Sequence, residues 1–218
     1  MGSFKQIAID GPAAAGKSTI AKIVAEKLGY VYVDTGAMYR AITLKALQTG
    51  TNLDDGAALE TLLAKTDITL APAGVVLVDS VDVTEAIRHT DVTSQVSLVA
   101  SYEGIRNTLK ERQAQMANHA NVIMDGRDIG THVLPDADFK FFMIADARVR
   151  AVRRLEENRL RGIIEDLDEV EAQIRKRDEM DENREHAPLK QAPDAILIDT
   201  SALSIPQVVD KMVGFVLQ

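Results

Sequence analysis

The first stretch whose residues could do chemistry is a glycine-rich loop that ends in lysine, serine and threonine. Its sequence is Gly11-Pro12-Ala13-Ala14-Ala15-Gly16-Lys17-Ser18-Thr19, which fits the spacing G-x-x-x-x-G-K-[ST]. The backbone N–H groups of such a loop cradle nucleotide phosphates, and its glycines let the chain approach them closely. Lys17 would reach the β- and γ-phosphates, and the Ser18 hydroxyl would ligate Mg²⁺. The loop therefore predicts a site for a nucleoside triphosphate with Mg²⁺.

A helix is expected to begin where this loop ends. Apolar residues recur at helical spacing between Ser18 and Leu28, and the apolar run Ile7-Ala8-Ile9 before the loop indicates a strand. The N-terminus of a helix favours bound anions, because its free N–H groups and its dipole point towards them. An ordinary glycine-rich turn is the alternative, but it does not require a strand before it and a helix after it.

A set of arginines within recurring sequence patterns is the second feature of the chain that could do chemistry. Phosphoryl transfer needs alignment and positive charge around the migrating group. A hydroxyl acceptor benefits from a carboxylate base, whereas a phosphate monoester, with a second pKa of about 6, is already ionised and needs several cations. Guanidinium groups suit phosphate oxygens and stay charged at every working pH. The candidates are Arg40, Arg106, Arg127, Arg177 and Arg184, and they favour a phosphate acceptor.

Five short apolar runs are predicted to be the strands that position these groups. Several are apolar throughout, as expected for strands covered on both faces, and helical segments lie between them. The pattern predicts βαβ units around a parallel sheet. The predicted strands are Gln6–Asp10, Tyr30–Asp34, Asn121–Asp125, Phe139–Ile144 and Ala195–Asp199.

Four of these five runs end in aspartate, and two of those aspartates are candidate site residues. Ligands bind beyond the carboxyl ends of strands in open parallel sheets, which is where Asp34 and Asp125 would lie. The alternative is that a strand-end aspartate only caps the turn that follows it.

Composition limits the function classes. With 218 residues of which 46% are hydrophobic, the chain suits one compact α/β domain with a small insertion. The absence of cysteine excludes disulfides and cysteine-ligated zinc and is typical of a reducing cytosol, so we expect a cytoplasmic protein. A net charge of −8 argues against nucleic-acid binding, and no apolar stretch approaches the length of a membrane span.

Two stretches depart from the alternation of strands and helices. Short β-like runs with a turn at Ala73-Gly74 predict a small antiparallel insert from about Thr66 to Ala86. The segment from Arg148 to Arg161 carries six arginines and is followed by an acidic run, as in mobile segments that close over a nucleotide. A solvated helix with ion pairs is the alternative for that segment.

Three further motifs combine arginine with aspartate. They are Asp34-Thr35-Gly36-Ala37-Met38-Tyr39-Arg40, Asp125-Gly126-Arg127-Asp128-Ile129-Gly130-Thr131 and Arg177-Asp178-x-x-Asp181-x-x-Arg184-x-x-Ala187-Pro188-Leu189. With the phosphate loop and the β insert, they resemble those of the bacterial cytidylate kinases from about Lys5 to Gln218. The one departure is Thr35, where serine is equally expected, and it keeps the hydroxyl.

The resemblance implies a fold and an activity. The fold is a three-layer α/β P-loop NTPase fold with a five-stranded parallel sheet in the order 2-3-1-4-5, a small β insert and a helical lid. The core is expected at 1–65 and 87–218, the insert at 66–86 and the lid at 148–165. The activity is transfer of the γ-phosphoryl of ATP to CMP or dCMP with Mg²⁺, giving CDP or dCDP and ADP in pyrimidine metabolism. A monomer that binds neither nucleic acid nor membrane is implied.

The resemblance also implies roles for individual residues. The donor nucleotide is bound by Gly11, Pro12, Ala13, Ala14, Ala15, Gly16, Lys17, Ser18 and Thr19. The catalytic set is Lys17, Arg127, Arg154, Arg177 and Arg184. The acceptor is bound by Thr35, Arg40, Ser97, Arg106, Arg127, Asp128, Asp181 and Arg184. Mg²⁺ is held by Ser18 and, through water, by Asp125.

Within the acceptor set, three residues are expected to read the cytosine base. Asp128 can accept from the N4 amine, while Arg106 and Ser97 can donate to N3 and O2. Uracil would leave buried groups unpaired, a loss of about 1–3 kcal/mol. The alternatives are an exposed Arg106 on a helix, an Asp128–Arg127 ion pair and an ordinary helical Ser97. The four histidines lack metal-ligand spacing and are expected to be structural.

Two other functions compete with this interpretation. One is a kinase acting on a small hydroxyl metabolite, with Asp34 as the base. The other is a nucleotide-dependent switch, which needs a segment that reads guanine or senses the γ-phosphate. The chain has no N-K-x-D, and Asp125-Gly126-Arg127-Asp128 lacks the D-x-x-G spacing of a switch.

Overall fold

The protein is described by a computed structural model covering residues 4–217, and the chain divides into two compact units. The first unit joins the N-terminal segment up to Tyr32 to the segment from Ala117 onwards, and the second is Val33–Met116. Each unit has a hydrophobic core of its own. The division of the chain into a core, an insert and a lid by function stays a prediction.

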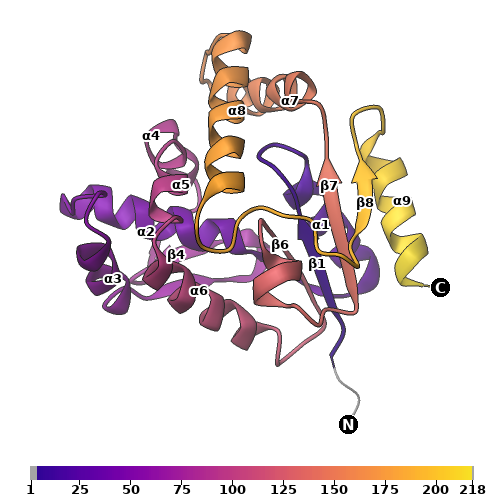
Figure 1. Cartoon of the computed structure of the whole chain (residues 1–218), viewed down its shortest axis with the longest axis horizontal. Coiled ribbons are helices and arrows are strands. Elements are labelled where there is room, and N and C mark those ends of the chain that lie inside the picture. The colour runs from indigo at the N-terminus through magenta and orange to yellow at the C-terminus, as the bar shows by residue number, and fades with distance from the viewer. Residues whose placement is uncertain (1–3, 218) are drawn as a thin grey trace. The chain divides into compact units, whose positions relative to one another are not determined.

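The first unit alternates strands and helices (Figure 1). Its strands are β1 (Gln6–Asp10), the beginning of β2 (Val31–Asp34), β6 (Val122–Gly126), β7 (Phe139–Ile144) and β8 (Ile196–Asp199). Its helices are α1 (Lys17–Leu28), a π-helical turn at Ile129–Val133, α7 (Ala147–Leu160), α8 (Leu167–Asn183) and α9 (Ile205–Val216). Each predicted strand is present, with ends that differ by at most one residue.

The strands form a five-stranded sheet in the order β2-β6-β1-β7-β8, which confirms the predicted order. The central strand β1 pairs in parallel with both β6 and β7, and Ile9 lies opposite Asp125. Ile7, Ala8 and Ile9 have no exposed surface, as expected for a strand covered on both faces. The parallel register brings the ends of β1 and β6 together, so the residues that follow them share one edge of the sheet.

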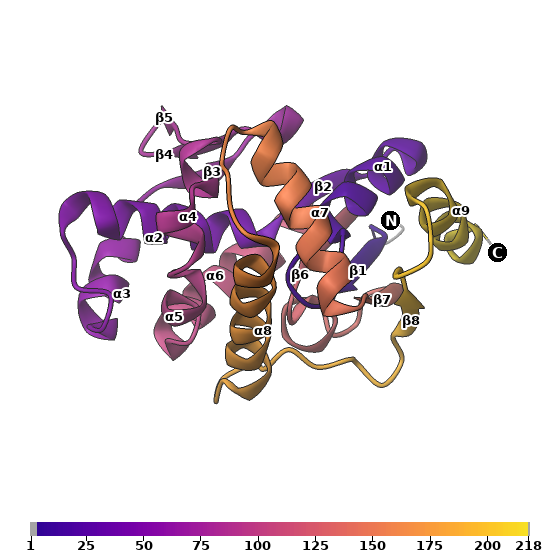
Figure 2. The same cartoon turned by 90° about the horizontal axis from the view of Figure 1, so that it is seen from above.

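Helices cover this sheet through aliphatic side chains. Figure 1 shows α1 and α9 close to the sheet, and Ile20 and Val24 of α1 share a core with Val209 of α9 and Phe141 of β7. Helices α7 and α8 pack against each other and cross at an angle (Figure 1 and Figure 2). Their contact includes a small apolar cluster of Ala151, Val170 and Ile174. Burial of these faces holds the phosphate loop between rigid elements.

The second unit is mostly helical and contains a small antiparallel sheet. Its helices are α2 (Thr35–Thr49), α3 (Gly56–Ala64), α4 (Thr90–Thr93), α5 (Val96–Val99) and α6 (Glu103–Met116). Its short strands are β3 (Ile68–Leu70), β4 (Val76–Val78) and β5 (Val81–Asp82), paired antiparallel in that order. The connection between β3 and β4 is a 3-10 turn at Pro72–Gly74, where the sequence indicated a turn at Ala73-Gly74.

We expect Gly11→Ala to destabilise the protein by about 2 kcal/mol or more. Gly11 has φ +146, and a Cβ at this position would collide with the Met143 carbonyl oxygen in β7. Gly29→Ala is the matched control, because Gly29 also has a positive φ, but among residues 4–217 no atom outside Gly29 and its two chain neighbours lies within 4 Å of the place its new methyl group would take. The free energy of unfolding of Gly29→Ala should be lower than that of the wild type by only about 1–2 kcal/mol. Urea unfolding measures both, and equal losses would mean that the collision at Gly11 is relieved by movement.

Candidate active site

The phosphate loop enters α1 through backbone angles that most residues avoid. Ala14 has φ +57 and Gly16 has φ +88, and Gly16 is the N-cap residue of α1. The Lys17 side chain is buried, and its Nζ donates to the Pro12 carbonyl at 2.7 Å. Burial, reinforced by the nearby Arg127 guanidinium, lowers the pKa of Lys17 well below the usual lysine value. An anion beside this amine would reverse that effect and favour its charged form.

A hydroxyl and a carboxylate meet beside the loop. Ser18 Oγ donates to Asp125 Oδ2 at 2.8 Å, and the Tyr32 hydroxyl donates to Asp125 Oδ1 at 2.7 Å. Mg²⁺ in nucleotide sites takes one or two protein oxygens, substrate phosphate oxygens and several waters. The Ser18–Asp125 pair fits that donor set. Within residues 4–217 no group of three or more His, Cys, Asp or Glu side chains could hold a metal on its own.

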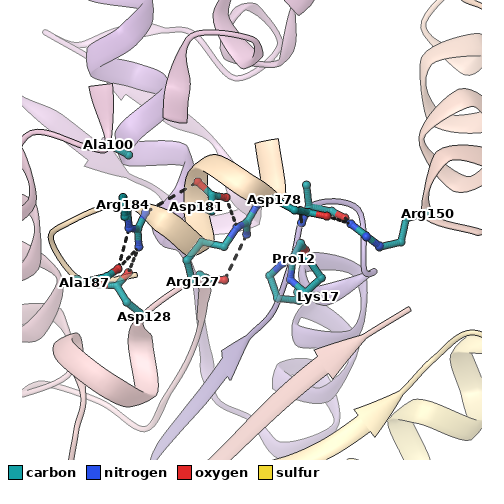
Figure 3. A network of polar contacts seen from close by, with 12 residues as sticks. Pro12, Lys17, Ala100, Arg127, Asp128, Arg150, Asp178, Asp181, Arg184 and Ala187 are labelled. Atoms are coloured by element: carbon teal, nitrogen blue, oxygen red, sulfur yellow. Dashed lines mark hydrogen bonds and ion pairs between the residues drawn. The ribbon is translucent and has the colours of Figure 1, made fainter. Parts of the chain in front are cut away.

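Two arginines and two carboxylates lie close together where β6 and α8 end (Figure 3). Arg127 Nε donates to Asp181 Oδ2 at 2.8 Å, and the Arg184 guanidinium lies 3.6 Å from Asp128 and 4.0 Å from Asp181. Arg184 also donates to the carbonyl of Ala187. Asp128 therefore lies beside Arg184, and no described ion pair joins it to Arg127, the alternative weighed from sequence.

The Asp181 carboxylate of this group stays ionised despite its burial. Burial alone would raise the pKa of Asp181, but the Arg127 and Arg177 guanidiniums hold that pKa below its usual value. Desolvation would likewise lower the pKa of Arg127, and the Asp181 charge raises it above the usual value. The group is therefore a set of charged side chains held in place by mutual attraction, ready to rearrange around an anionic ligand.

The turn that carries Arg127 and Asp128 is held by a carboxylate at the end of β1. Asp10 Oδ1 accepts from the backbone N–H of Ile129 at 2.8 Å, and Asp10 Oδ2 accepts from that of Gly130 at 2.7 Å. Burial raises the pKa of Asp10 to about 7, although both hydrogen bonds oppose this change.

A raised pKa at Asp10 makes stability depend on pH in a definite direction. The folded protein keeps the Asp10 proton up to a higher pH than the unfolded chain does, so the free energy of unfolding falls as pH rises towards 7. Between pH 5 and 7 the contribution of this residue is about 2–3 kcal/mol. Urea unfolding of the wild type and of Asp10→Asn at both pH values measures it. If the two proteins give parallel profiles, Asp10 is already ionised at pH 5.

The second unit carries its own cluster of cations around Asp34. The Asp34 side chain caps α2 by accepting from Ala37 N at 2.9 Å, and Arg40 Nη2 lies 2.9 Å from Asp34 Oδ2. The Arg88 guanidinium is 3.7 Å from the same oxygen. Arg40 Nε is buried and has no hydrogen-bond partner in the part of the chain that the structure describes. Burial favours the neutral acid, yet Arg40 and Arg88 together lower the pKa of Asp34 below its usual value.

Three other residues predicted for the acceptor also lie in the second unit. Arg106 is buried on α6, donates to the Ala100 carbonyl at 3.1 Å and lies 5.5 Å from the centre of the Tyr39 ring. The alternative of an exposed Arg106 is therefore wrong. Ser97 is buried on α5, and Thr35 is buried in the first turn of α2.

Two arginines of the predicted catalytic set, Arg154 and Arg177, lie on α7 and α8. Arg154 lies on α7 with its Nε 3.9 Å from the Glu157 carboxylate, one turn along the same helix. Arg177 lies on α8 one residue before Asp178, close enough to influence the pKa values of Lys17 and Asp181. Their catalytic roles stay predictions.

Comparison with known proteins decides the family. A family model described as "Cytidylate kinase" matches residues 7–218. The chain is 53% identical to a cytidylate kinase of Bacillus licheniformis over 96% of its own length and 95% of that protein. It is 52% identical to a cytidylate kinase of Listeria monocytogenes, covering 95% and 94% of the two chains. The chain belongs to the cytidylate kinase family. It is accordingly a P-loop kinase, a nucleotide-binding phosphotransferase.

Solved structures show the same fold in other kinases. A gluconokinase from Sinorhizobium meliloti aligns over 98% of this chain and 92% of its own, with a TM-score of 0.52 and 12% identity. At that identity the likeness concerns the fold alone. The P-loop α/β fold predicted from the sequence is confirmed. None of the helices described for this cytidylate kinase family member is both long and apolar enough to cross a membrane.

Some residues of the site were missed by the sequence analysis. Tyr32 could have been found, because it lies two residues before Asp34 in a strand and two-residue spacing places both on one face. Asp178 stood inside a quoted motif but received no role, although its side chain is buried and accepts from the loop N–H of Ala13. Arg88 and Arg150 carried no sequence signal that separates them from surface arginines.

Proposed function

We propose that this chain transfers the γ-phosphoryl of ATP to CMP or dCMP with Mg²⁺, giving CDP or dCDP and ADP in pyrimidine nucleotide metabolism. Membership of the cytidylate kinase family supports the activity. The phosphate loop binds the donor, and Lys17 neutralises charge on its β- and γ-phosphates. Mg²⁺, when bound, neutralises phosphate charge and is held by Ser18 and, through water, by Asp125.

The observation that carries the proposal is the buried group of Arg127, Asp181, Arg184 and Asp128. Its two guanidinium groups offer several N–H donors, and the carboxylates keep them charged and oriented before a phosphate arrives. A nucleoside monophosphate brings one phosphate and several hydroxyl and base donors and acceptors. Arginines can turn to the phosphate, and the carboxylates then accept from the ribose and the base.

The remaining acceptor roles follow the family resemblance. Arg40, with Arg127 and Arg184, binds the acceptor phosphate, and Thr35 contributes its hydroxyl. Asp181 binds the ribose hydroxyls together with Arg184. Ser97, Arg106 and Asp128 read the cytosine. The buried Nε of Arg40, which has no hydrogen-bond partner among the described residues, supports a ligand-binding role for that side chain.

The state of Asp34 argues against a hydroxyl acceptor. A general base must be free to take a proton at the working pH, and its pKa should lie near that pH. Asp34 instead accepts from Arg40 and from Ala37 N, and its pKa lies below the usual value. It is better suited to holding Arg40 than to removing a proton. A phosphate acceptor needs no such base.

A panel of acceptors tests the proposal. Purified protein with ATP and Mg²⁺ is given CMP, dCMP, UMP, AMP or GMP, and the nucleoside diphosphate formed is measured directly. We expect CMP and dCMP to give the highest kcat/KM. Equal turnover of all five monophosphates would refute the cytosine specificity, and a stable GTP complex with no effect of CMP would favour a nucleotide-dependent switch.

Asp128→Asn should narrow the preference for CMP over UMP by about tenfold. A carboxylate accepts from the cytosine N4 amine and repels the uracil oxygen, whereas an amide can donate as well as accept. The measurement is the ratio of kcat/KM for the two substrates in the variant and the wild type. Asp136→Asn, an exposed aspartate in the loop before β7, is the control and should leave the ratio unchanged. Unchanged discrimination in Asp128→Asn would mean that another group reads the base.

The proposed enzyme works as a cytoplasmic monomer and binds neither nucleic acid nor a membrane. A net charge of −8 supports the absence of nucleic-acid binding, because it would repel a phosphate backbone. Sedimentation of the purified protein tests the monomer.

A further inference from the structure

A single residue of the phosphate loop, Ala13, is held on both sides by an ion pair. Asp178 Oδ1 of α8 accepts from Ala13 N at 3.0 Å, and Arg150 Nη1 of α7 donates to Ala13 O at 3.0 Å. Arg150 Nη1 and Asp178 Oδ2 lie 2.5 Å apart, which closes the set of contacts (Figure 3). We call Arg150 and Asp178 the loop clamp.

The clamp is buried and anchored. The side chains of Arg150 and Asp178 are only 7% and 11% exposed, so their attraction is little screened by water. Arg150 Nε also donates to the carbonyl of Ala145, in the link between β7 and α7, at 2.9 Å. The Arg150 guanidinium therefore joins the segment after β7 to the phosphate loop and to α8. Such a contact fixes geometry more strictly than a single lysine charge could.

A second contact joins the loop to the same two helices. Ala14, the next residue, packs against the apolar cluster of Ala151, Val170 and Ile174 between α7 and α8. Ala14 takes a positive φ, a conformation that costs energy in a residue with a Cβ. The clamp and the apolar cluster thus hold a strained part of the loop against the helix pair.

The helix that carries the clamp carboxylate also carries three side chains that were given roles at the nucleotides. Asp178 stands between Arg177 and Asp181 on α8, and Arg184 follows at its C-terminal end. Those neighbours are side chains assigned to the phosphates and the ribose, whereas neither Arg150 nor Asp178 was given a role. A shift of α8 against the loop would move these groups relative to the donor phosphates.

We propose that Arg150 and Asp178 are positioning residues for phosphoryl transfer. They fix the position of the phosphate loop relative to the cationic side chains of α8. The inference rests on the proposed kinase activity. Rates of in-line transfer depend steeply on alignment, and a misplacement of about 1 Å can cost about a hundredfold. The clamp acts through the loop and the helix and touches neither nucleotide.

The test uses Asp178→Asn and Arg150→Met, which keep side-chain volume and remove one charge each. We expect kcat for CMP phosphorylation to fall about tenfold to a hundredfold in both, with smaller changes in KM. The double variant should be no slower than the slower single variant, because either substitution alone already removes the ion pair between residues 150 and 178. Arg150→Lys keeps the positive charge but loses the several N–H donors of the guanidinium. Its kcat should lie between those of Arg150→Met and the wild type.

The matched control is Arg148→Met, close to Arg150 on the same helix. Arg148 pairs with Asp168 and Glu171 across the same two helices, but at the exposed surface and without contacting the loop. It should keep wild-type kcat. Circular dichroism gives the folded fraction of each variant, and rates are expressed per folded molecule.

A spectroscopic measurement separates positioning from mere stability. In a ¹H–¹⁵N spectrum, the Ala13 amide should move in Asp178→Asn and stay in place in Arg148→Met. Normal kcat per folded molecule in both clamp variants, or losses that multiply in the double variant, would overturn the proposal. A wild type that fails to phosphorylate CMP would instead refute the proposed function, so the two failures are distinguishable.

Discussion

Lys17→Met lowers kcat by about a thousandfold while the protein stays folded. The methionine fills the space of the buried lysine stem, but it removes the cation assigned to the β- and γ-phosphates. Because burial and the Arg127 guanidinium already lower the pKa of Lys17, removing its charge relieves a repulsion in the nucleotide-free protein. Single-turnover rates at saturating ATP and CMP, together with thermal unfolding, measure the two effects.

The control for this variant is Lys27→Met on the same helix. Lys27 is exposed and pairs with Asp210 at 3.0 Å, a surface contact of little energetic value. It should leave kcat unchanged. If Lys17→Met retains more than about a tenth of the wild-type rate, the loop lysine does not stabilise the transferring group, and the assignment of the loop as the donor site is wrong.

Arg184→Met lowers kcat/KM for CMP by about a thousandfold and changes ATP affinity by less than about threefold. Arg184 is buried beside Asp128 and Asp181, so its loss removes N–H donors assigned to the acceptor phosphate and takes one positive charge away from two carboxylates. Steady-state kinetics with CMP varied, and calorimetric titration with a non-hydrolysable ATP analogue, measure the two quantities separately.

Arg175→Met is the matched control for Arg184. Arg175 lies on the same helix and pairs with Glu171 at the surface, with its side chain 62% exposed. It should behave like the wild type in both measurements. Equal losses of ATP and CMP binding in Arg184→Met would place Arg184 on the donor side or in a purely structural role.

The sheet could be predicted because its strands carry a strong local signal. Ile7, Ala8 and Ile9 make the centre of Gln6–Asp10 apolar on both faces, a pattern typical of a strand in the middle of a parallel sheet. The alternating segments then fixed the βαβ connections, and the resemblance supplied the strand order. The phosphate loop was equally readable, because its glycines and lysine occupy positions that the chemistry requires.

Partnerships between side chains far apart in sequence could not be predicted in the same way. The sequence left an Asp128–Arg127 ion pair open as an alternative, but Arg127 pairs with Asp181 and Asp128 lies beside Arg184. The arginine-rich segment was predicted to be a lid, and of its arginines only Arg154 was given a role. Both Arg148 and Arg150 pair with carboxylates of α8, but only Arg150 also reaches the phosphate loop and is buried, whereas Arg148 stays exposed. Such differences depend on packing angles between helices.

The central claim is that the acceptor is recognised by its phosphate, and a comparison of CMP with cytidine tests it most directly. Both carry the same base and ribose, so they differ only in the group that the arginines are proposed to bind. The account predicts that CMP binds and is phosphorylated, while cytidine neither binds detectably in calorimetry nor yields CMP with ATP and Mg²⁺. Phosphorylation of cytidine at a rate comparable to that of CMP would contradict it.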